Sequence, residues 1–221
     1  MRQRLVELEM LYASGLILNQ LSSPKKIGEK IIELLEEKMD WHHSTIRLYN
    51  PEDGTFQLIA FNHRSLKTEQ EYRQAEEHFK DQVSKPGDGI TGWVLRNNQT
   101  VRSGKVNTDP RYRETYPGMR SGLYVPMRLG PNAIGVISVE SEKPDAFSES
   151  DERLVTTLSS QAAVAIENAL LSSNLERRVR ERTTEVQDLY DNAPTGYHSL
   201  DASGCFRQVN QTELNWLGYT R

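Results

Sequence analysis

The sequence is poor in cysteine and contains no long hydrophobic run. Its 221 residues include one cysteine, Cys205, so no disulfide can form within the chain, which fits a reducing compartment. No stretch approaches the roughly 18 apolar residues of a membrane span, and residues 1–9 lack the apolar core of a secretory signal. Positive charge is not in excess, because the net charge is −4. We therefore expect a cytoplasmic protein with no membrane span in this chain and no nucleic-acid partner.

Two helices are expected at the start of the chain. In residues 1–21, leucine and other apolar residues recur at three- and four-residue steps, which predicts an amphipathic helix. The residues Ser22-Ser23-Pro24 interrupt this pattern. Ser23 is a suitable N-cap and Pro24 suits the first position of a second helix, whose apolar positions begin at Ile27.

The middle of the chain carries the signals of an antiparallel sheet. Residues 44–49 and 55–61 are rich in strand-forming residues and flank the turn sequence Asn50-Pro51-Glu52-Asp53-Gly54, which predicts a hairpin. Further along, the composition predicts a helix over 67–83, a short helix ending at Asn97, and strands over 100–102, 121–127 and 134–141.

A long helix is predicted from Ser148 to about Tyr190. Ser148 and Asp151 have the spacing of a capping box. The second half of this helix has a heptad-like apolar pattern between dense Arg and Glu residues, at Leu175, Val179, Arg182, Val186 and Leu189. Because an isolated charged helix is marginal in water, a parallel partner helix is the simplest way to stabilise it.

Several segments, in this order, resemble the GAF family of small-molecule sensor domains over residues 22–171. They are the hairpin Ile46 to Phe61, Gly89-Ile90-Thr91-Gly92-Trp93-Val94, Asp109-Pro110-Arg111-Tyr112, Arg120-Ser121-Gly122-Leu123-Tyr124-Val125-Pro126, Ile134 to Ser141, and the helix Ala162 to Ala169. The resemblance implies an α+β fold, in which helices from both ends of the domain cover one face of an antiparallel sheet. Loops and short helices on the other face form a ligand pocket in members that bind one.

The last residues, 191–221, are similar to the first third of a PAS domain, through the turn at Asp201 to Gly204, Val209-Asn210 and Leu217-Gly218-Tyr219. A whole PAS domain needs about 100 residues, so we expect a truncated PAS fragment. Its apolar residues should lack packing partners: Leu200, Phe206, Val209, Leu214 and Trp216. The expected organisation is an N-terminal helix (1–21), a GAF domain (22–171), a coiled-coil linker helix (172–190) and this fragment (191–221), all part of a larger signalling protein.

A ligand site is expected on the pocket face of the GAF sheet. Strand alternation puts Arg47 on the face opposite Ile46, and Ser138 and Glu140 on the face opposite Ile137. Because the resemblance makes these strands neighbours, we expect Arg47 and Glu140 to meet and border a polar ligand; the alternative is a structural ion pair in an empty pocket. The resemblance adds further candidates for the pocket: Phe61, Trp93, Arg102, Asp109, Tyr112 and Tyr124.

Other activities of the GAF family fit the sequence less well. Lys143, Phe147, Asp151 and Glu152 nearly match the signature of cyclic-nucleotide-binding members, but Glu142 stands where Asn is expected. Residues 1–204 contain no cysteine, which argues against covalent bilin attachment and against the thiolate-dependent reduction of free methionine sulfoxide. The five histidines lack metal-ligand spacing, so we expect no metal or haem and exposed or hydrogen-bonded histidines.

Two functions remain open. In the first, the GAF domain senses a small ligand and relays its state through a dimeric helix in a signal-transduction protein, for which a sensor histidine kinase is the expected parent and a cyclic-dinucleotide enzyme the alternative. In the second, the domain is a ligand-free dimerisation scaffold. Both predict a homodimer through the N-terminal and linker helices, at Leu5, Leu8, Tyr12, Leu175, Val179, Val186 and Leu189. The chain itself contains no catalytic motif.

Overall fold

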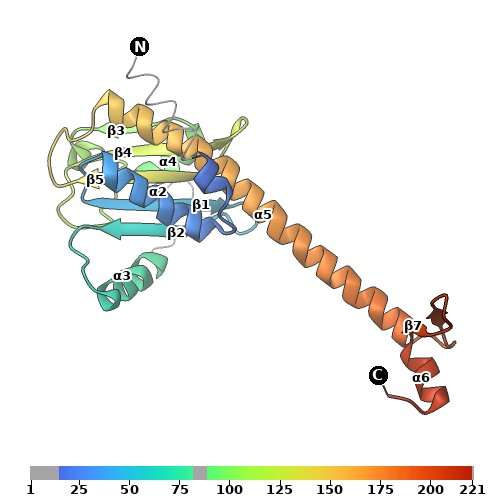
Figure 1. Ribbon diagram of the computed structural model, residues 1–221. Coiled ribbons are helices and arrows are strands. Elements are labelled where there is room, and N and C mark those ends of the chain that lie inside the picture. Colours follow the sequence, from blue (N-terminus) through green and yellow to red (C-terminus); the bar gives the residue numbers. More distant parts are fainter. Residues whose placement is uncertain (1–14, 82–88, 221) are drawn as a thin grey trace. The chain divides into compact units, whose positions relative to one another are not determined.

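The computed structural model describes residues 15–81 and 89–220, which form parts of two compact units. The first unit extends to Leu170 and contains a five-stranded sheet with helices on both faces (Figure 1). The second begins at Leu171 and contains a two-stranded hairpin and a short helix. One helix, α5 (Glu149–Asp191), contributes its first half to the first unit and its second half to the second unit.

The five strands are arranged in the order β2-β1-β5-β4-β3, and all neighbouring strands are antiparallel. They are β1 (His43–Asn50), β2 (Thr55–His63), β3 (Val101–Ser103), β4 (Ser121–Leu129) and β5 (Asn132–Ser141). The hairpin predicted over 44–61 is confirmed as β1 and β2. In its turn the Asp53 carboxylate accepts hydrogen bonds from the amide and the hydroxyl of Thr55.

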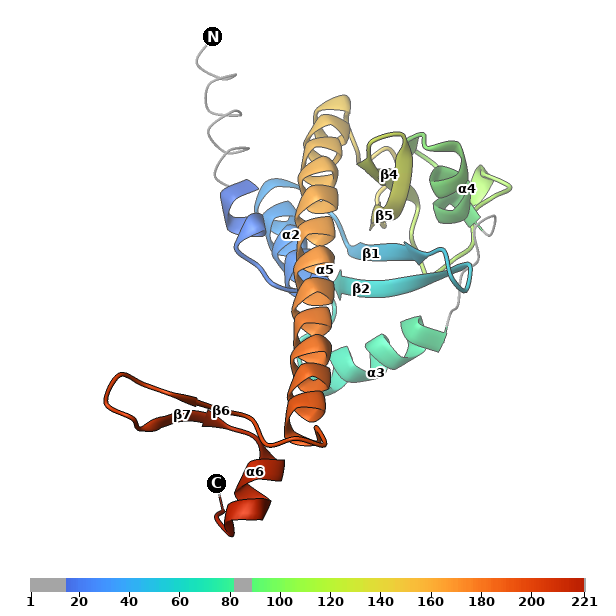
Figure 2. The same ribbon diagram turned by 90° about the vertical axis from the view of Figure 1, so that its right-hand side faces the viewer.

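The main core lies between the sheet and a layer formed by α2 (Pro24–Lys38) and the first half of α5 (Figure 2). Residues of α2 at helical spacing, Ile27, Ile31 and Leu35, are fully buried against this face of the sheet. From the sheet side, Ile137 and Val139 of β5 point into the same core. The predicted α+β fold, with helices from both ends of the domain on one face, is therefore confirmed.

A smaller core covers the opposite face of the sheet. There α4 (Gly89–Asn97) and the short 3-10 helix η1 (Val106–Thr108) accompany residues of β2, β4 and β5. The buried side chains of this core include Ile90, Val94 and Val136. A further helix, α3 (Glu69–Asp81), contacts the edge strand β2. The two cores share the strands β4 and β5, whose alternate residues point to opposite faces.

The starts of the two main helices carry the caps that the sequence predicts. At α2, the Ser23 hydroxyl accepts a hydrogen bond from the amide of Lys26, and Pro24 occupies the first helical position. At α5, the Ser148 hydroxyl accepts from the amide of Asp151, and the Asp151 carboxylate accepts from the amide of Ser148. This reciprocal pair is the predicted capping box.

A buried asparagine links the elements of the second unit. This unit contains the end of α5, the hairpin β6 (His198–Leu200) and β7 (Phe206–Val209), and α6 (Gln211–Leu217). The Asn210 amide group donates to the carbonyls of Tyr190 and Thr195, and its oxygen accepts from the amide of Tyr197. Asn210 therefore joins the end of the long helix to the hairpin.

The apolar side chains of this unit differ in burial. Leu200, Phe206 and Trp216 are exposed, as we expected for these three side chains. Leu214, which we also expected to be unpacked, is only 7% exposed, because α6 folds back on the residues that Asn210 organises. That expectation is wrong for Leu214.

Most of the N-terminal helix predicted over residues 1–21 lies outside the described residues. Residues 15–19 are helical, whereas Leu5, Leu8 and Tyr12 are not described.

Among the helices that the structure describes, α5 meets the length and composition of a membrane span, and 44% of its apolar window is buried within the fold. Core helices of soluble proteins share this combination, so the finding is weak evidence for a membrane.

The contact between α2 and β2 gives a first testable prediction. A Cβ atom at Gly28 would lie 2.8 Å from the Cβ of Ala60, whereas one at Gly15 would meet its nearest neighbour, a Gln161 side-chain atom, at 3.5 Å. Gly28→Ala should therefore lower the free energy of unfolding by about 1–2 kcal/mol, since overpacking outweighs the gain in helix propensity. The matched control Gly15→Ala should raise it by about 0.5–1 kcal/mol. Equal stabilisation of both variants in urea denaturation would show that α2 is free to move away from β2.

Candidate functional site

A small cavity lies on the sheet face that carries α4, opposite the main helix layer. Its volume is about 50 Å³. The sheet forms its floor, and the start of α4 together with residues 112–115 forms its roof. Its lining is mostly polar and consists of His43, Thr45, Arg47, Gly89, Ile90, Thr91, Tyr112, Arg113, Thr115, Tyr124, Ser138 and Glu140.

The strand register sets the floor of the cavity. Thr45, Ser138 and Tyr124 lie opposite one another on β1, β5 and β4 and form its central row. Glu140 lies two residues beyond this row, and Arg47 two residues beyond it in the other direction. Because side chains of one face recur every second residue, all five point to the same side of the sheet.

Glu140 is anchored by a hydrogen bond from a tyrosine. The hydroxyl of Tyr124 donates to Oε1 of Glu140 over 2.5 Å. The tyrosine ring reaches it by crossing Gly122, the cross-strand neighbour of Glu140 on β4. A Cβ atom at Gly122 would lie only 2.7 Å from a ring carbon of Tyr124. The glycine therefore leaves the space through which the two side chains meet.

Burial dominates the electrostatics of Glu140. The side chain is 4% exposed. Loss of hydration raises the pKa of its carboxyl to about 7, although the hydrogen bond from Tyr124 and the positive charge of Arg47 act in the opposite direction. The same burial, reinforced by the charge of Glu140, holds the pKa of Tyr124 well above its usual value. Tyr124 therefore remains a protonated donor at neutral pH.

Arg47 is buried without a contact partner. It is 5% exposed, and no hydrogen bond or ion pair joins its guanidinium to another described residue. Its pKa is lowered by burial and raised by the more distant charge of Glu140. The expected contact between Arg47 and Glu140 is absent, because the register places Val136 opposite Arg47 and His43 opposite Glu140. The structural ion pair that we weighed as an alternative is not formed either.

Buried polar atoms at this cavity lack a hydrogen-bond partner in the described part of the chain. They include Oε2 of Glu140, the hydroxyl of Ser138 and the hydroxyl of Tyr112. Leaving such a group unpaired in the interior costs about 1–3 kcal/mol. Folded proteins leave few buried groups unpaired, and these gather where water or a ligand binds. The cavity is therefore the candidate ligand site of the described residues.

An aromatic cluster extends from the cavity toward β2. The rings of His63 and Tyr116 stack with centroids 3.6 Å apart, and the ring of His43 stacks on Tyr116 at 5.2 Å. Burial and the charges of His63 and Arg47 lower the pKa of His43 to about 3. His43 is 2% exposed, so it is not one of the exposed histidines that we expected; a backbone hydrogen bond with Asn62 raises its pKa against the effect of burial.

The roof of the cavity is held by a charge pair stacked on a tryptophan. Asp109 accepts two side-chain hydrogen bonds from Arg111, at 2.9 and 2.6 Å. The Arg111 guanidinium lies 4.5 Å from the ring centroid of Trp93 on α4. Trp93 and Asp109, both predicted as ligand residues, thus lie in the wall that supports Tyr112 rather than in the lining.

Two predicted ligand residues lie elsewhere. Arg102 on β3 lies opposite Leu123, whose side chain belongs to the main core, and its guanidinium donates to Glu152 of α5 over 2.9 Å. It is therefore on the sheet face away from the cavity. Phe61 is on the same face as Thr45 but contacts Tyr72 of α3.

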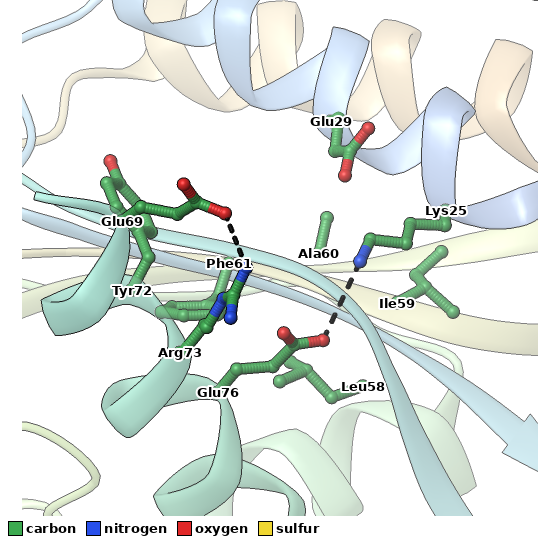
Figure 3. Close-up of a pocket in the computed structure, with 10 residues that line it drawn as sticks. All are labelled: Lys25, Glu29, Leu58, Ile59, Ala60, Phe61, Glu69, Tyr72, Arg73 and Glu76. Atoms are coloured by element: carbon green, nitrogen blue, oxygen red, sulfur yellow. Dashed lines mark hydrogen bonds and ion pairs between the residues drawn. The ribbon is translucent and has the colours of Figure 1, made fainter.

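Phe61 instead lines a second, more open cavity of about 380 Å³ between α2, β2 and α3 (Figure 3). Most of the charged side chains of this second cavity are paired. Lys25 approaches Glu76 across it at 3.7 Å, and Arg73 donates to Glu69 of the same helix over 2.7 Å. Because these ion pairs are exposed to solvent, they do not mark a binding site as the buried groups of the small cavity do.

Of the nine predicted ligand residues, the structure brings five to the small cavity: Arg47, Tyr112, Tyr124, Ser138 and Glu140. The sequence reasoning missed the other lining residues: His43, Thr45, Gly89, Ile90, Thr91, Arg113 and Thr115. Counting back from Arg47 in steps of two would have found Thr45 and His43. No comparable signal marks Thr91 and Thr115, because they come from a helix start and a loop.

The near-match to the cyclic-nucleotide signature has a structural role. Asp151 caps α5, and Lys143 pairs with Asp40 over 2.7 Å, so the lysine does not reach the capping aspartate. Glu152 pairs with Arg102 on the sheet face that α2 and α5 cover, away from the cavity. Within residues 15–81 and 89–220, no group of three or more His, Cys, Asp or Glu side chains is placed to hold a metal ion.

Comparison with known proteins identifies a family. The model of the GAF domain matches residues 22–167. A stretch of 75 residues is 28% identical to the regulatory protein LuxO of Vibrio cholerae. This stretch covers 34% of the present chain and 14% of LuxO, so the chain spans a small part of that curated relative.

Solved structures share the fold at low sequence identity. The GAF domain of a phosphoenolpyruvate-protein phosphotransferase from Acinetobacter is 19% identical, with a TM-score of 0.62, over 76% of this chain and 98% of that chain. The free methionine-R-sulfoxide reductase from Neisseria meningitidis, solved in complex with its substrate, is 18% identical, with a TM-score of 0.61, over 73% of this chain and 89% of that chain.

The raised pKa of Glu140 predicts a pH-dependent stability. Below pH 4.5 the carboxyl is protonated in both states; between 4.5 and about 7 it ionises in the unfolded chain but keeps its proton when folded. Stability should therefore fall as pH rises through this window, by on the order of 3 kcal/mol. Glu140→Gln removes the effect.

Urea denaturation between pH 4 and 8.5 measures the difference between the Glu140→Gln variant and the unaltered chain. That difference should grow with pH up to about 7 and then level off. Ser138→Ala, a change in the same cavity without a titrating group, should give a difference that is constant with pH. Parallel curves for the unaltered chain and Glu140→Gln would show that the carboxyl titrates at its ordinary pKa.

Proposed function

Because the chain belongs to the GAF domain family, we propose that it is a sensory and regulatory module that binds a small polar ligand in the cavity between β1, β4, β5 and α4. The observation that carries this proposal is a set of buried polar atoms at one cavity that have no partner among the described residues, beside an arginine that likewise contacts none of them. A ligand there would satisfy groups that the fold leaves unpaired. A domain of the same fold, the Neisseria reductase, was solved with its substrate bound.

The long helix α5 is proposed to relay the state of the cavity. Its residues from Val155 to Ala169 pack in the main core against the far side of the strands that form the cavity floor. The buried hydroxyl of Ser159 also donates to the carbonyl of Pro126 on β4 over 3.3 Å. A ligand that favours one arrangement of these strands would shift the population of helix positions.

The proposed setting is a larger cytoplasmic signalling protein. The resemblance of residues 191–221 to the start of a PAS domain supports a GAF–helix–PAS order, for which a sensor histidine kinase is the expected parent. The similarity to the regulatory protein LuxO is consistent with signalling. We propose no enzymatic activity, because reductase chemistry needs a reactive thiolate and the one cysteine, Cys205, lies outside the GAF domain. No bilin, metal, nucleic acid or membrane span enters the proposal.

A homodimer through the linker helix is the second part of the proposal. An apolar stripe on α5 is open to solvent, with Leu175, Val179, Val186 and Leu189 between 57% and 69% exposed. Heptad spacing makes a second copy of the helix the fitting partner. The same stripe supports the competing candidate, a scaffold that dimerises and binds no ligand.

Native mass spectrometry of the freshly purified chain tests the sensory proposal. We expect a non-covalent extra mass that is absent from the denatured protein. Arg47→Met should lose it, because the buried cation that faces the ligand is removed. Arg102→Met should keep it, since that arginine lies on the opposite face of the sheet. A clean mass for every protein, or equal loss in both variants, would favour the scaffold.

The linker dimer is tested by adding charge to the stripe. Leu175→Asp with Val186→Asp should weaken self-association at least about 100-fold, because two carboxylates would be buried at a helix interface. Light scattering during size-exclusion chromatography measures the mass. Ser173→Asp with Thr184→Asp adds the same charge to exposed positions outside the stripe and should leave the dimer intact. A dimer that survives the first pair of changes would place the interface elsewhere.

A further inference from the structure

A carboxyl and a guanidinium are buried at the two ends of the small cavity, and neither touches an oppositely charged group among the described residues. Arg47 and Glu140 are 5% and 4% exposed. In the register of β1 and β5, the backbone positions of Arg47 and Glu140 are four residues apart, or roughly 13 Å along the strand. The cavity between them is lined by both side chains. Since buried ionisable groups are normally paired in contact, the cavity has a place for a cation at the Glu140 end, where it would stabilise the ionised carboxyl, and for an anion at the Arg47 end.

At the Glu140 end of the cavity no described cation contacts the carboxyl, although Arg47 acts on it from a distance and Arg113 also lines the cavity. His43 lies opposite Glu140 and is neutral, because burial lowers its pKa to about 3. Tyr124 occupies only one carboxylate oxygen, and Oε2 remains without a partner among the described residues. The nearby carboxylate of Glu114 adds negative potential. A cationic hydrogen-bond donor is therefore the group that fits this end.

The Arg47 end of the cavity has the opposite character. The guanidinium of Arg47 has free donors, and Gly89, Ile90 and Thr91 of the first turn of α4 line the same cavity. The amides at a helix start have no intrahelical acceptor, and the helix dipole makes that end positive. An anionic group such as a carboxylate is the one that both features favour.

The size of the cavity limits the ligand. A volume of about 50 Å³ corresponds to roughly four water positions. This admits a molecule of only a few non-hydrogen atoms unless the roof moves. It excludes a nucleotide or a tetrapyrrole in the present arrangement.

We propose that the ligand of this cavity is a small dipolar molecule, such as a short amino acid, which places its ammonium group on Glu140 and its carboxylate on Arg47 at the start of α4. The inference rests on the proposed sensory function and names the class of ligand for it. Such a molecule supplies both missing counter-charges in one binding event. It also offers donors and acceptors to Ser138 and Tyr112.

Isothermal titration calorimetry of the whole 221-residue chain tests this class. The probes are glycine, β-alanine and γ-aminobutyrate, which lengthen the charge separation stepwise. The monopolar controls are acetate, propionate and butyrate, together with methylamine, ethylamine and propylamine. One amino acid should bind at least about tenfold more tightly than the carboxylate and the amine from which it is composed, because each buried charge–hydrogen-bond contact is worth a factor of that size.

Three variants assign the ends of the ligand. Glu140→Gln should weaken the best amino acid about tenfold and leave its carboxylate analogue unchanged. Arg47→Met should weaken both. Arg102→Met, on the other face of the sheet, should change neither. If the carboxylate binds as tightly as the amino acid, Glu140 does not hold a cation and the proposal is wrong.

The two proposals fail separately. If no probe binds but the purified chain carries an adduct that Arg47→Met removes, the dipolar class is wrong and the sensory function stands. If no probe binds and no adduct is present, both are wrong. If the mass of the adduct identifies a molecule with only an anionic or only a cationic group, the dipolar class is wrong and the sensory function stands.

Discussion

Strands β1 and β5 are buried on both faces, and this constraint governs the rest of the structure. Each strand must present one set of side chains to the helix layer and another to the cavity. Ile137 and Val139 meet the first demand, while Ser138 and Glu140 meet the second. A shift of register by one residue would drive the charged set into the main core, so the apolar packing against α2 and α5 also fixes where the polar groups point.

The polar face is tolerated because the apolar face is strongly packed. Natural sequences depart from consistent local rules mainly at functional sites, where stability elsewhere offsets the departure. Here the departures coincide among the described residues: one oxygen of the Glu140 carboxyl and the guanidinium of Arg47 have no contact partner there, and a glycine, Gly122, occupies a strand position so that Tyr124 fits. A stable protein without a ligand function would gain by replacing such groups with apolar ones.

The sequence was sufficient for the fold because its local signals agree. The caps at Ser23 and Ser148, the turn at Asp53 and the alternation in β5 all indicate the same architecture. The site was harder to predict, because its members depend on register. Arg102 shares a residue type with Arg47 but lies on the wrong face, since it pairs with Leu123. The contact expected between Arg47 and Glu140 failed for the same reason: alternation gives the face and not the position along the strand.

The two sets of residues on β5 also connect the cavity to the helix. Glu140 and Val139 are consecutive residues of one strand, so a displacement of the first by a ligand moves the second against α5. A close-packed core does not absorb such a movement by compression. It responds by shifting a packed element between discrete positions, and α5 is the element that leaves this core and continues toward the second unit. The floor of the cavity and the buried first half of α5 therefore belong to one packed layer, which is the structural basis of the relay that we propose.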